Sequence, residues 1–416
     1  MNLFKTSALN GVAVLIATIT SFIVNKLLAI YVGPSGYALI GQFQNFIQMI
    51  TSFSGGAINT AVIKYTAEYH DNKSYQISVW KTAGSVIIIF SMVVALLILI
   101  FQKQLAIHIF HSLEYQSIFV WFASLLLFFN LNALFLAILN GKKEILRLVI
   151  ANIAGSIFSL IITGLLAFKL GLYGALVAIS INQSIIFIVT LFLCYKSSWF
   201  KISYLFGKID KSILNKFGGY VLMALTAALC VPLSQILIRN YIGGEFGIRY
   251  AGYWEAMIKL SRAYLMLVTT TLSVYYLPRL SELKDFKSIK NEVYTGYKFI
   301  FPVALLGALI VYSLKDWIIP LLFSASFLPM RELFLWQMIG DSLKIGSWVI
   351  SYVMAGQAMT KIFIASEIIS TITLLIITYI CTKVFGFEGV SIAYMINYGL
   401  YWAIISLVVF RAIRLR

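Results

Sequence analysis

Long apolar stretches without charge recur along this chain and constrain its fold more than any other feature. About 20 apolar residues let a helix cross the roughly 30 Å hydrocarbon core of a bilayer, where backbone groups must pair within the segment. Hydrophobic residues make up 61% of the 416 residues and charged residues only 11%, whereas soluble domains carry about 25% charged residues. The sequence therefore predicts an all-α membrane protein.

Twelve such stretches are expected, and the connections between them are short. The longest central connection divides them into an N-terminal six-helix bundle over 1–200, a linker over 201–213 and a C-terminal six-helix bundle over 214–416. The predicted spans are 6–32, 37–63, 79–102, 115–141, 145–168, 171–195, 214–238, 250–277, 296–314, 332–355, 361–382 and 387–410.

Basic residues indicate the orientation of these spans. If the N-terminus is cytoplasmic, 21 Lys and Arg residues fall on the cytoplasmic side and seven on the other. The seven are Lys103, Lys169, Arg239, Arg249, Lys315, Arg331 and Lys383. Because cytoplasmic loops are enriched in Lys and Arg, both termini are expected in the cytoplasm.

An internal repeat relates the two halves. The segment 171–182 matches the segment 386–397 at a constant offset of 215 residues, with identity at Gly171, Gly174, Ala178, Ile181 and Asn182. Halves of six spans share one orientation, so we predict parallel repeats related by an axis along the membrane normal, an architecture of rocking transporters.

Seven ionisable residues lie within the predicted spans, where a central charge costs at least about 2.5–3.5 kcal/mol. They are Lys26, Glu255, Lys259, Arg262, Asp341, Lys344 and Glu367. Glu255, Lys259 and Arg262 share one helical face, and so do Gln337, Asp341 and Lys344. Together with Gln42, Asn45 and Gln48 on the second span, they predict a hydrated cavity with a net positive charge and an anionic guest.

The same residues also have purely structural interpretations. Asp341 with Lys344, and Glu255 with Lys259, are spaced to form neutralising pairs within one helix. Lys26 is long enough to reach an interface by snorkelling. The amides of the second span suit interhelical hydrogen bonds as well as sugar contacts.

Other chemistries have little support in the sequence. The net charge of +17 is dispersed over short loops, with no basic aromatic domain for nucleic acid. Cys194, Cys230 and Cys381 lie in or beside apolar segments, and His108 with His111 has no further ligand nearby, so neither a disulfide framework nor a metal site is expected. No nucleophile and base pair stands out, which argues against an enzyme.

Four sequence blocks carry a resemblance to a known family. They are Lys26-Leu-Leu-Ala29 followed by Gly33-Pro34, the segment 64–72 from Lys64-Tyr65 to Asp71-Asn72, the segment 273–278, and the block 330–344 that ends in Asp341-Ser-Leu-Lys344. In these blocks the chain resembles Wzx-type flippases, in the polysaccharide transporter branch of the MOP superfamily. It is most similar to lipid III flippases of enterobacterial common antigen and to related O-antigen flippases.

This resemblance implies translocation of an undecaprenyl-pyrophosphate-linked oligosaccharide across a bacterial inner membrane, with no cofactor. Lys26, Asp341 and Lys344 fall on positions of the family pattern, whereas Glu255, Lys259 and Arg262 depart from the lipid III pattern and favour an O-antigen unit as cargo. The O-antigen polymerase and the chain-length regulator are the partners such a flippase would have. The alternative is a MATE-like drug exporter, but a site for organic cations should be acidic rather than basic.

The orientation is testable by cysteine labelling in intact cells. In a cysteine-free background, a membrane-impermeant maleimide should label Lys315→Cys from outside. It should label Lys208→Cys only after the membrane is disrupted, because the positive-inside rule assigns Lys208 to the cytoplasm. The reverse pattern would contradict the predicted orientation.

Overall fold

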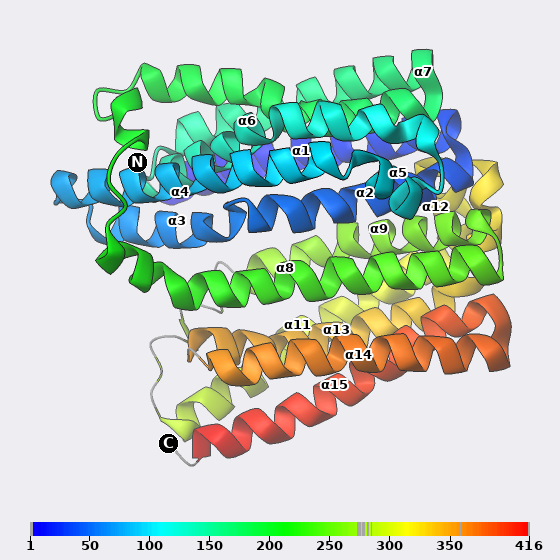
Figure 1. Ribbon diagram of the computed structural model, residues 1–416. Helices are drawn as coiled ribbons and strands as arrows, with labels where there is room; N and C mark the ends of the chain where they lie inside the picture. Colours follow the sequence, from blue (N-terminus) through cyan, green and yellow to red (C-terminus); the bar gives the residue numbers. More distant parts are fainter. Residues whose placement is uncertain are drawn as a thin grey trace. The chain divides into compact units, whose positions relative to one another are not determined.

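The computed structural model describes residues 3–272, 276, 279–280, 283, 285–357 and 359–414, without the side chains of 3–10, 216, 219–220, 267 and 270–271. Every regular element in this part of the chain is a helix (Figure 1). The helices form two compact units, Met1–Ala228 and Leu229–Arg416. Apart from Tyr276, the motif 273–278 lies outside the described residues.

The first unit is organised around two helices, α6 and α7. Helix α1 packs on α7, while α3 and α4 pack on α6. The elements of this unit are α1 (Leu3–Tyr31), α2 (Gly33–Phe53), η1 (Gly56–Ile58), α3 (Asn59–Glu68), α4 (Lys73–Ile100), α5 (Gln102–Phe110), η2 (Leu113–Tyr115), α6 (Gln116–Gly141), α7 (Ile145–Tyr195), η3 (Ile202–Leu205) and the start of α8 (Lys211–Glu245).

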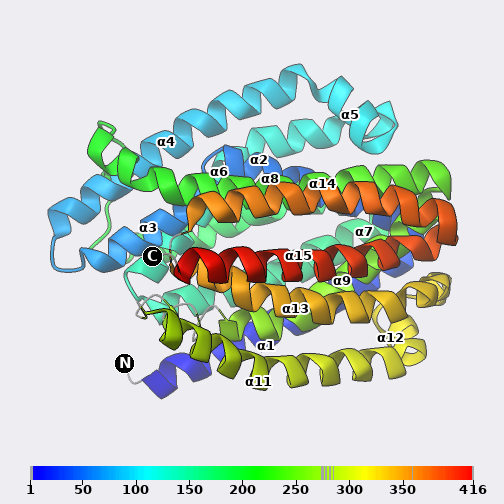
Figure 2. The same cartoon turned by 90° about the horizontal axis from the view of Figure 1, so that it is seen from below.

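The second unit is organised around α13 and α15, which run side by side (Figure 2). Helices α9 and α11 pack on α13, and α14 packs on α15. The elements of this unit are the end of α8, then α9 (Ile248–Thr271), α11 (Phe286–Ser313), α12 (Lys315–Leu322), η5 (Ala325–Leu333), α13 (Phe334–Gly356), α14 (Thr360–Phe385), η6 (Gly386–Glu388) and α15 (Gly389–Arg414).

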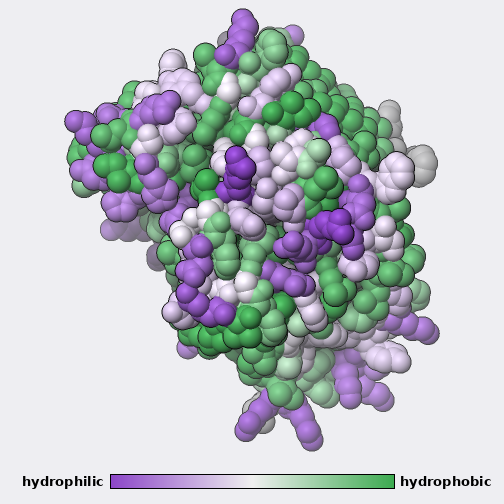
Figure 3. Space-filling view, turned by 90° about the vertical axis from the view of Figure 1, so that its right-hand side faces the viewer, coloured by the Kyte–Doolittle hydropathy of each residue, from purple (hydrophilic) through white to green (hydrophobic). Residues whose placement is uncertain are grey.

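The helices are long and apolar enough for a multi-pass membrane protein. In the described part of the chain, seven helical stretches qualify as spans by length and composition, and the bent pair α2 and α3 adds an eighth. Two of these stretches, Ile145–Tyr195 and Thr360–Arg414, each contain two helices. Helices α9 and α13 are long enough but are interrupted by polar residues, so the structure is compatible with about twelve spans. Large hydrophobic areas reach the surface (Figure 3).

The same sharp turn joins the last two helices of each predicted half. Gly171 has φ 56° and ψ −132°, and Gly386 has φ 64° and ψ −146°, a region that other residues rarely adopt. Three residues later, a Cβ on Gly174 would lie 2.0 Å from the carbonyl oxygen of Leu166, and one on Gly389 would lie 2.3 Å from that of Cys381. The internal repeat is therefore also a repeat of backbone geometry.

The second predicted span is broken, which corrects the expectation of one continuous helix over 37–63. Helices α2 and α3 meet at 64°. Side chains of other helices bind Ser54 at the break, because Asn130 donates to its hydroxyl at 2.7 Å and Ser91 donates to its backbone carbonyl at 3.3 Å. In lipid such a break is tolerated only when neighbours replace the lost backbone bonds.

Side-chain caps set where three helices begin. Asn72 accepts from the backbone N–H of Tyr75 at 3.0 Å at the start of α4, and Asp210 accepts from that of Ser212 at 2.8 Å at the start of α8. The backbone N–H of Ser288 donates to Asp285 at the start of α11 and holds the pKa of that carboxyl below its ordinary value. These caps end the connecting loops and begin the helices that follow.

The close approach at Gly389 predicts a position-specific effect on stability. Gly389→Ala should destabilise the protein by about 2 kcal/mol or more, because its Cβ meets backbone that cannot move aside. Gly399→Ala in the same helix is the control, since its Cβ would meet only Leu343 at 3.6 Å. Thermal unfolding of the purified variants measures both, and equal melting temperatures would contradict the packing described.

Candidate functional site

The second unit gathers most of the charged residues that the sequence places in lipid. Helix α9 carries Glu255, Lys259 and Arg262, helix α13 carries Asp341 and Lys344, and these two helices pack together. Figure 2 shows α9, α13 and α15 as neighbouring helices of this unit. We refer to these charged groups and the side chains that bind them as the polar cluster.

A buried ion pair lies at one end of the polar cluster. The Arg239 guanidinium of α8 donates to the Glu255 carboxylate, and both residues are 2% exposed. The Lys259 ammonium lies 3.9 Å from the other oxygen of Glu255. Two charges survive in a low-dielectric interior only if they neutralise each other, so this pair ties α8 to α9.

The helix that carries Arg239 extends beyond the predicted span 214–238. Arg239 lies inside α8, in the apolar stretch Val221–Glu245 that qualifies as a span. The predicted boundary at residue 238 lies one residue too early to include it. The signal was the apolar sequence on both sides, since Ile236-Leu-Ile238 precedes Arg239 and Tyr241-Ile242 follows.

Three side chains hold the Asp341 carboxylate, which has no exposed surface. The Tyr264 hydroxyl donates to it at 2.6 Å and the Tyr394 hydroxyl at 2.8 Å. The Gln337 amide lies 3.4 Å from the same carboxylate and also donates to the Ser261 hydroxyl at 3.2 Å. A buried carboxylate without such donors would be strongly destabilising, so Asp341 joins α9, α13 and α15.

Lys344 reaches Asp341 indirectly. Its ammonium donates to the Tyr394 hydroxyl at 3.1 Å, and Tyr394 in turn donates to Asp341. The ammonium also lies 5.2 Å from the ring centroid of Trp348 and 4.8 Å from that of Tyr398. Aromatic faces attract a cation at these distances, so the half-buried charge is held without a direct ion pair to Asp341 among the described residues.

Arg262 and Glu367 complete the cluster. Arg262 is exposed on α9 and interacts electrostatically with Glu255, Lys259 and Lys344. Glu367 on α14 accepts a hydrogen bond from the Tyr401 hydroxyl at 3.3 Å and interacts electrostatically with Lys344. The second unit thus holds four basic and three acidic groups in one region, with Arg262 the most accessible of them.

The other sequence-predicted residues lie in the first unit. Lys26 is half-buried on α1, and Gln42 and Asn45 are buried on α2, whereas Gln48 on the same helix is exposed. Near them, the Tyr37 hydroxyl donates to the Asn25 amide oxygen at 3.0 Å. The predicted residues are therefore divided between the two units.

Solved structures of transporters share this arrangement of helices. A multidrug resistance MATE family transporter of the MOP superfamily, in an inward-facing conformation, has a TM-score of 0.77 at 14% identity and covers 96% of this chain and 94% of its own. A MOP superfamily transporter from Pyrococcus furiosus has a TM-score of 0.70 at 17% identity, with coverage of 99% and 96%. The fold is that of MOP superfamily transporters.

Sequence comparison defines the family more narrowly. The family model described as polysaccharide biosynthesis protein matches residues 3–284, so the chain belongs to this family. The chain is 28% identical to the lipid III flippase of Escherichia coli K12 over 405 residues, 97% of each chain. It is 27% identical, over 76% of its length and 77% of the relative's, to a Shigella flexneri protein named for O-antigen transport. The resemblance predicted from the sequence is confirmed.

The buried ion pair predicts that removing one partner destabilises the protein more than removing both. Arg239→Leu should lower the unfolding free energy by about 3–5 kcal/mol, because it leaves the Glu255 charge buried without its main partner. The double variant Arg239→Leu with Glu255→Leu should recover much of that loss. Thermal unfolding of the purified variants provides the comparison, and a double variant as unstable as the single one would contradict this account of the pair.

Proposed function

We propose that this protein is a flippase that moves an undecaprenyl-pyrophosphate-linked oligosaccharide, an O-antigen unit or lipid III, from the cytoplasmic to the periplasmic leaflet. The observation that carries this proposal is the net positive polar cluster in a chain that matches a lipid III flippase over 97% of its length. The fold alone does not select the cargo, because MOP superfamily members with this fold include drug transporters.

The chemistry of the cluster supports an anionic cargo. Pyrophosphate oxygens accept charge-assisted hydrogen bonds from guanidinium and ammonium groups. Arg262, Lys259 and Lys344 supply such groups in the second unit, and Lys26 supplies one in the first. The rings of Trp348 and Tyr398 beside Lys344 offer flat apolar faces of the kind that sugar rings pack against.

The remaining polar residues have proposed roles that follow from their chemistry. Gln42, Asn45, Gln48 and Gln337 are candidates for sugar contacts, with Gln48 exposed and Gln337 fully buried in this conformation. Glu255 pairs with Arg239 and lies beside Lys259. Asp341 and Glu367 are candidate pairing or coupling carboxylates, because each accepts a hydrogen bond from a neutral tyrosine hydroxyl.

Transport would follow from alternating access between the two halves, which we propose to be 1–200 and 214–416, joined by the linker 201–213. The headgroup supplies contacts that differ between the inward-open and outward-open states, and only such a difference shifts their populations. The prenyl chain stays in lipid during the step.

We propose that the protein lies in the bacterial inner membrane with both termini in the cytoplasm, as a transporter rather than an enzyme. The O-antigen polymerase and the chain-length regulator are its proposed partners.

Reconstitution tests this function directly. Purified protein in liposomes should transfer a fluorescent short-chain prenyl-pyrophosphate oligosaccharide between leaflets. Lys344→Ala, Arg262→Ala and Lys26→Ala should each lower the rate by about tenfold or more, since each removes a charge-assisted hydrogen bond to pyrophosphate. Lys290→Ala, which alters an exposed lysine at the start of α11, is the matched control.

One result would overturn the proposed function, and another would overturn the proposed site. One is transport of organic cations together with no transfer of the prenyl-linked sugar, which would identify a drug exporter. The other is wild-type transfer by all three cationic variants, which would separate the flippase activity from these charges. Size-exclusion profiles of each variant establish that a lost rate is not a lost fold.

A further inference from the structure

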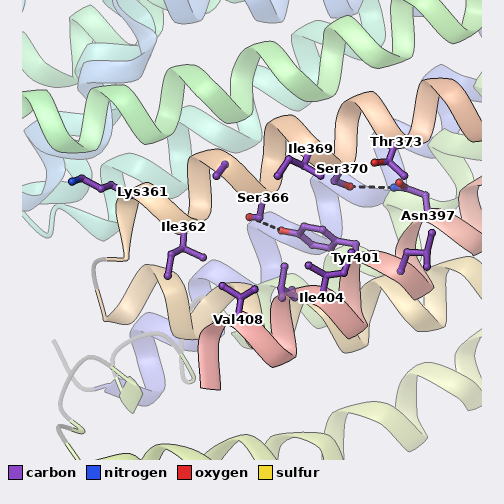
Figure 4. Close-up of a pocket in the computed structure, with 13 residues that line it drawn as sticks. Lys361, Ile362, Ser366, Ile369, Ser370, Thr373, Asn397, Tyr401, Ile404 and Val408 are labelled. Atoms are coloured by element: carbon purple, nitrogen blue, oxygen red, sulfur yellow. Dashed lines mark hydrogen bonds between the residues drawn. The ribbon is translucent and has the colours of Figure 1, made fainter. Parts of the chain in front are cut away.

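An elongated groove lies between α14 and α15, and Tyr401, which donates to Glu367 of the polar cluster, is one of its lining residues. Its cavity volume is about 300 Å³. We name it the α14/α15 groove (Figure 4), and its lining includes Lys361, Ser366, Ile369, Asn397, Tyr401 and Ile404. All of its lining residues belong to these two helices of the second unit.

The walls of the groove are apolar and open to the surroundings of the protein. Ile369 is 58% exposed and Ile404 is 53% exposed, and Leu400 and Val408 beside them are also exposed. In a chain that crosses a membrane, exposed apolar walls of this kind contact lipid chains. The groove is therefore shaped to receive a hydrocarbon chain from the bilayer.

The polar groups along the groove are bonded to one another. Asn397 donates to the Ser370 hydroxyl at 3.1 Å, and the hydroxyls of Ser366 and Tyr401 lie 3.4 Å apart (Figure 4). Groups already paired in this way leave little for a polar ligand to bind. The interior of the groove thus favours an apolar chain over a sugar.

One end of the groove carries a positive charge. Lys361 is exposed in the first turn of α14, at the end that the positive-inside rule assigns to the cytoplasm. From Lys361 the groove follows α14 to Thr373, about 18 Å at 1.5 Å per residue. That distance is close to half of the roughly 30 Å hydrocarbon core. An anionic headgroup at Lys361 would thus have its chain directed toward the bilayer centre.

The groove and the polar cluster share one wall. The Tyr401 ring lines the groove, and its hydroxyl donates to Glu367, which interacts electrostatically with Lys344. Tyr401 and Glu367 therefore link the apolar groove to the cationic region. A molecule with a diphosphate at one end and a long apolar chain at the other matches both features.

We propose that the α14/α15 groove binds the isoprenoid chain of the lipid-linked substrate in the cytoplasmic leaflet, with its diphosphate beside Lys361. This inference rests on the proposed flippase function and adds a docking site for the part of the substrate that does not cross the membrane. The groove would hold the lipid beside the polar cluster and so raise the local concentration of its headgroup there.

Photolabelling of the full-length protein in nanodiscs tests the groove. The probe is a short polyprenyl diphosphate with a diazirine in its last isoprene unit, and the readout is the set of labelled peptides. Label should map to residues 361–408, unlabelled prenyl diphosphate should compete, and excess phosphatidylglycerol should not. Label outside this range, or equal competition by phosphatidylglycerol, would overturn the proposal.

Substitutions in the groove, each with a control outside it, test the same site. Ile404→Trp, and independently Ile369→Trp, should lower labelling by about tenfold, because a bulky ring would occupy the space for the chain. Leu407→Trp is the matched control, since Leu407 lies on α15 outside the groove and is 75% exposed. Lys361→Glu, in the first turn of α14, should weaken labelling. Arg411→Glu, in the last turn of α15, should not. Unchanged labelling in both groove variants would refute the site.

The liposome assay keeps this inference separable from the proposed function. Transfer of prenyl-linked sugar without labelling of the groove would leave the flippase standing and remove the docking site. Labelling of the groove without any transfer would leave the binding site standing and remove the flippase.

Discussion

The cost of a charge in hydrocarbon governs the second unit more than any other interaction. Arg239 and Glu255 are both buried and satisfy each other, and Asp341 is held by hydroxyl groups from α9 and α15. Each of these contacts joins different helices, so the charges fix which faces of α8, α9, α13 and α15 meet. The apolar surfaces of the same helices remain free to face lipid. Apolar packing contributes little to the choice of helix partner there, because lipid chains are as apolar as the side chains.

Sequence patterns predicted the architecture well because its determinants are local. The helical, multi-pass fold followed from apolar length. The predicted internal repeat has a counterpart in the backbone, because its glycines at 171 and 386 adopt the same unusual conformation. The break between α2 and α3 was missed because its support comes from Asn130, on a helix far away in the sequence. Helical periodicity predicts which residues share a face, but not what that face meets.

The charged residues of the candidate site were predictable from the sequence, but most of their partners were not. The stripes on α9 and α13 were recognised from spacing, and the structure brings them into one cluster. Arg239 was predicted to lie just beyond the seventh span because that helix boundary was placed too early. The tyrosines that hold Asp341 and Lys344 gave no signal, since aromatic residues are abundant in membrane helices and only tertiary contacts distinguish Tyr264 and Tyr394. The sequence therefore revealed the charges of the polar cluster, and the structure revealed their partners.

The central claim is that the site of this MOP-fold transporter recognises a prenyl diphosphate, and ligand-induced stabilisation of the purified protein tests it most directly. A ligand present at about 100 times its Kd stabilises the folded state by ~2.7 kcal/mol. Farnesyl diphosphate should raise the melting temperature, less so in high salt and in Lys344→Ala, while tetraphenylphosphonium should leave it unchanged. A melting temperature raised by the organic cation and unmoved by the diphosphate would contradict the account.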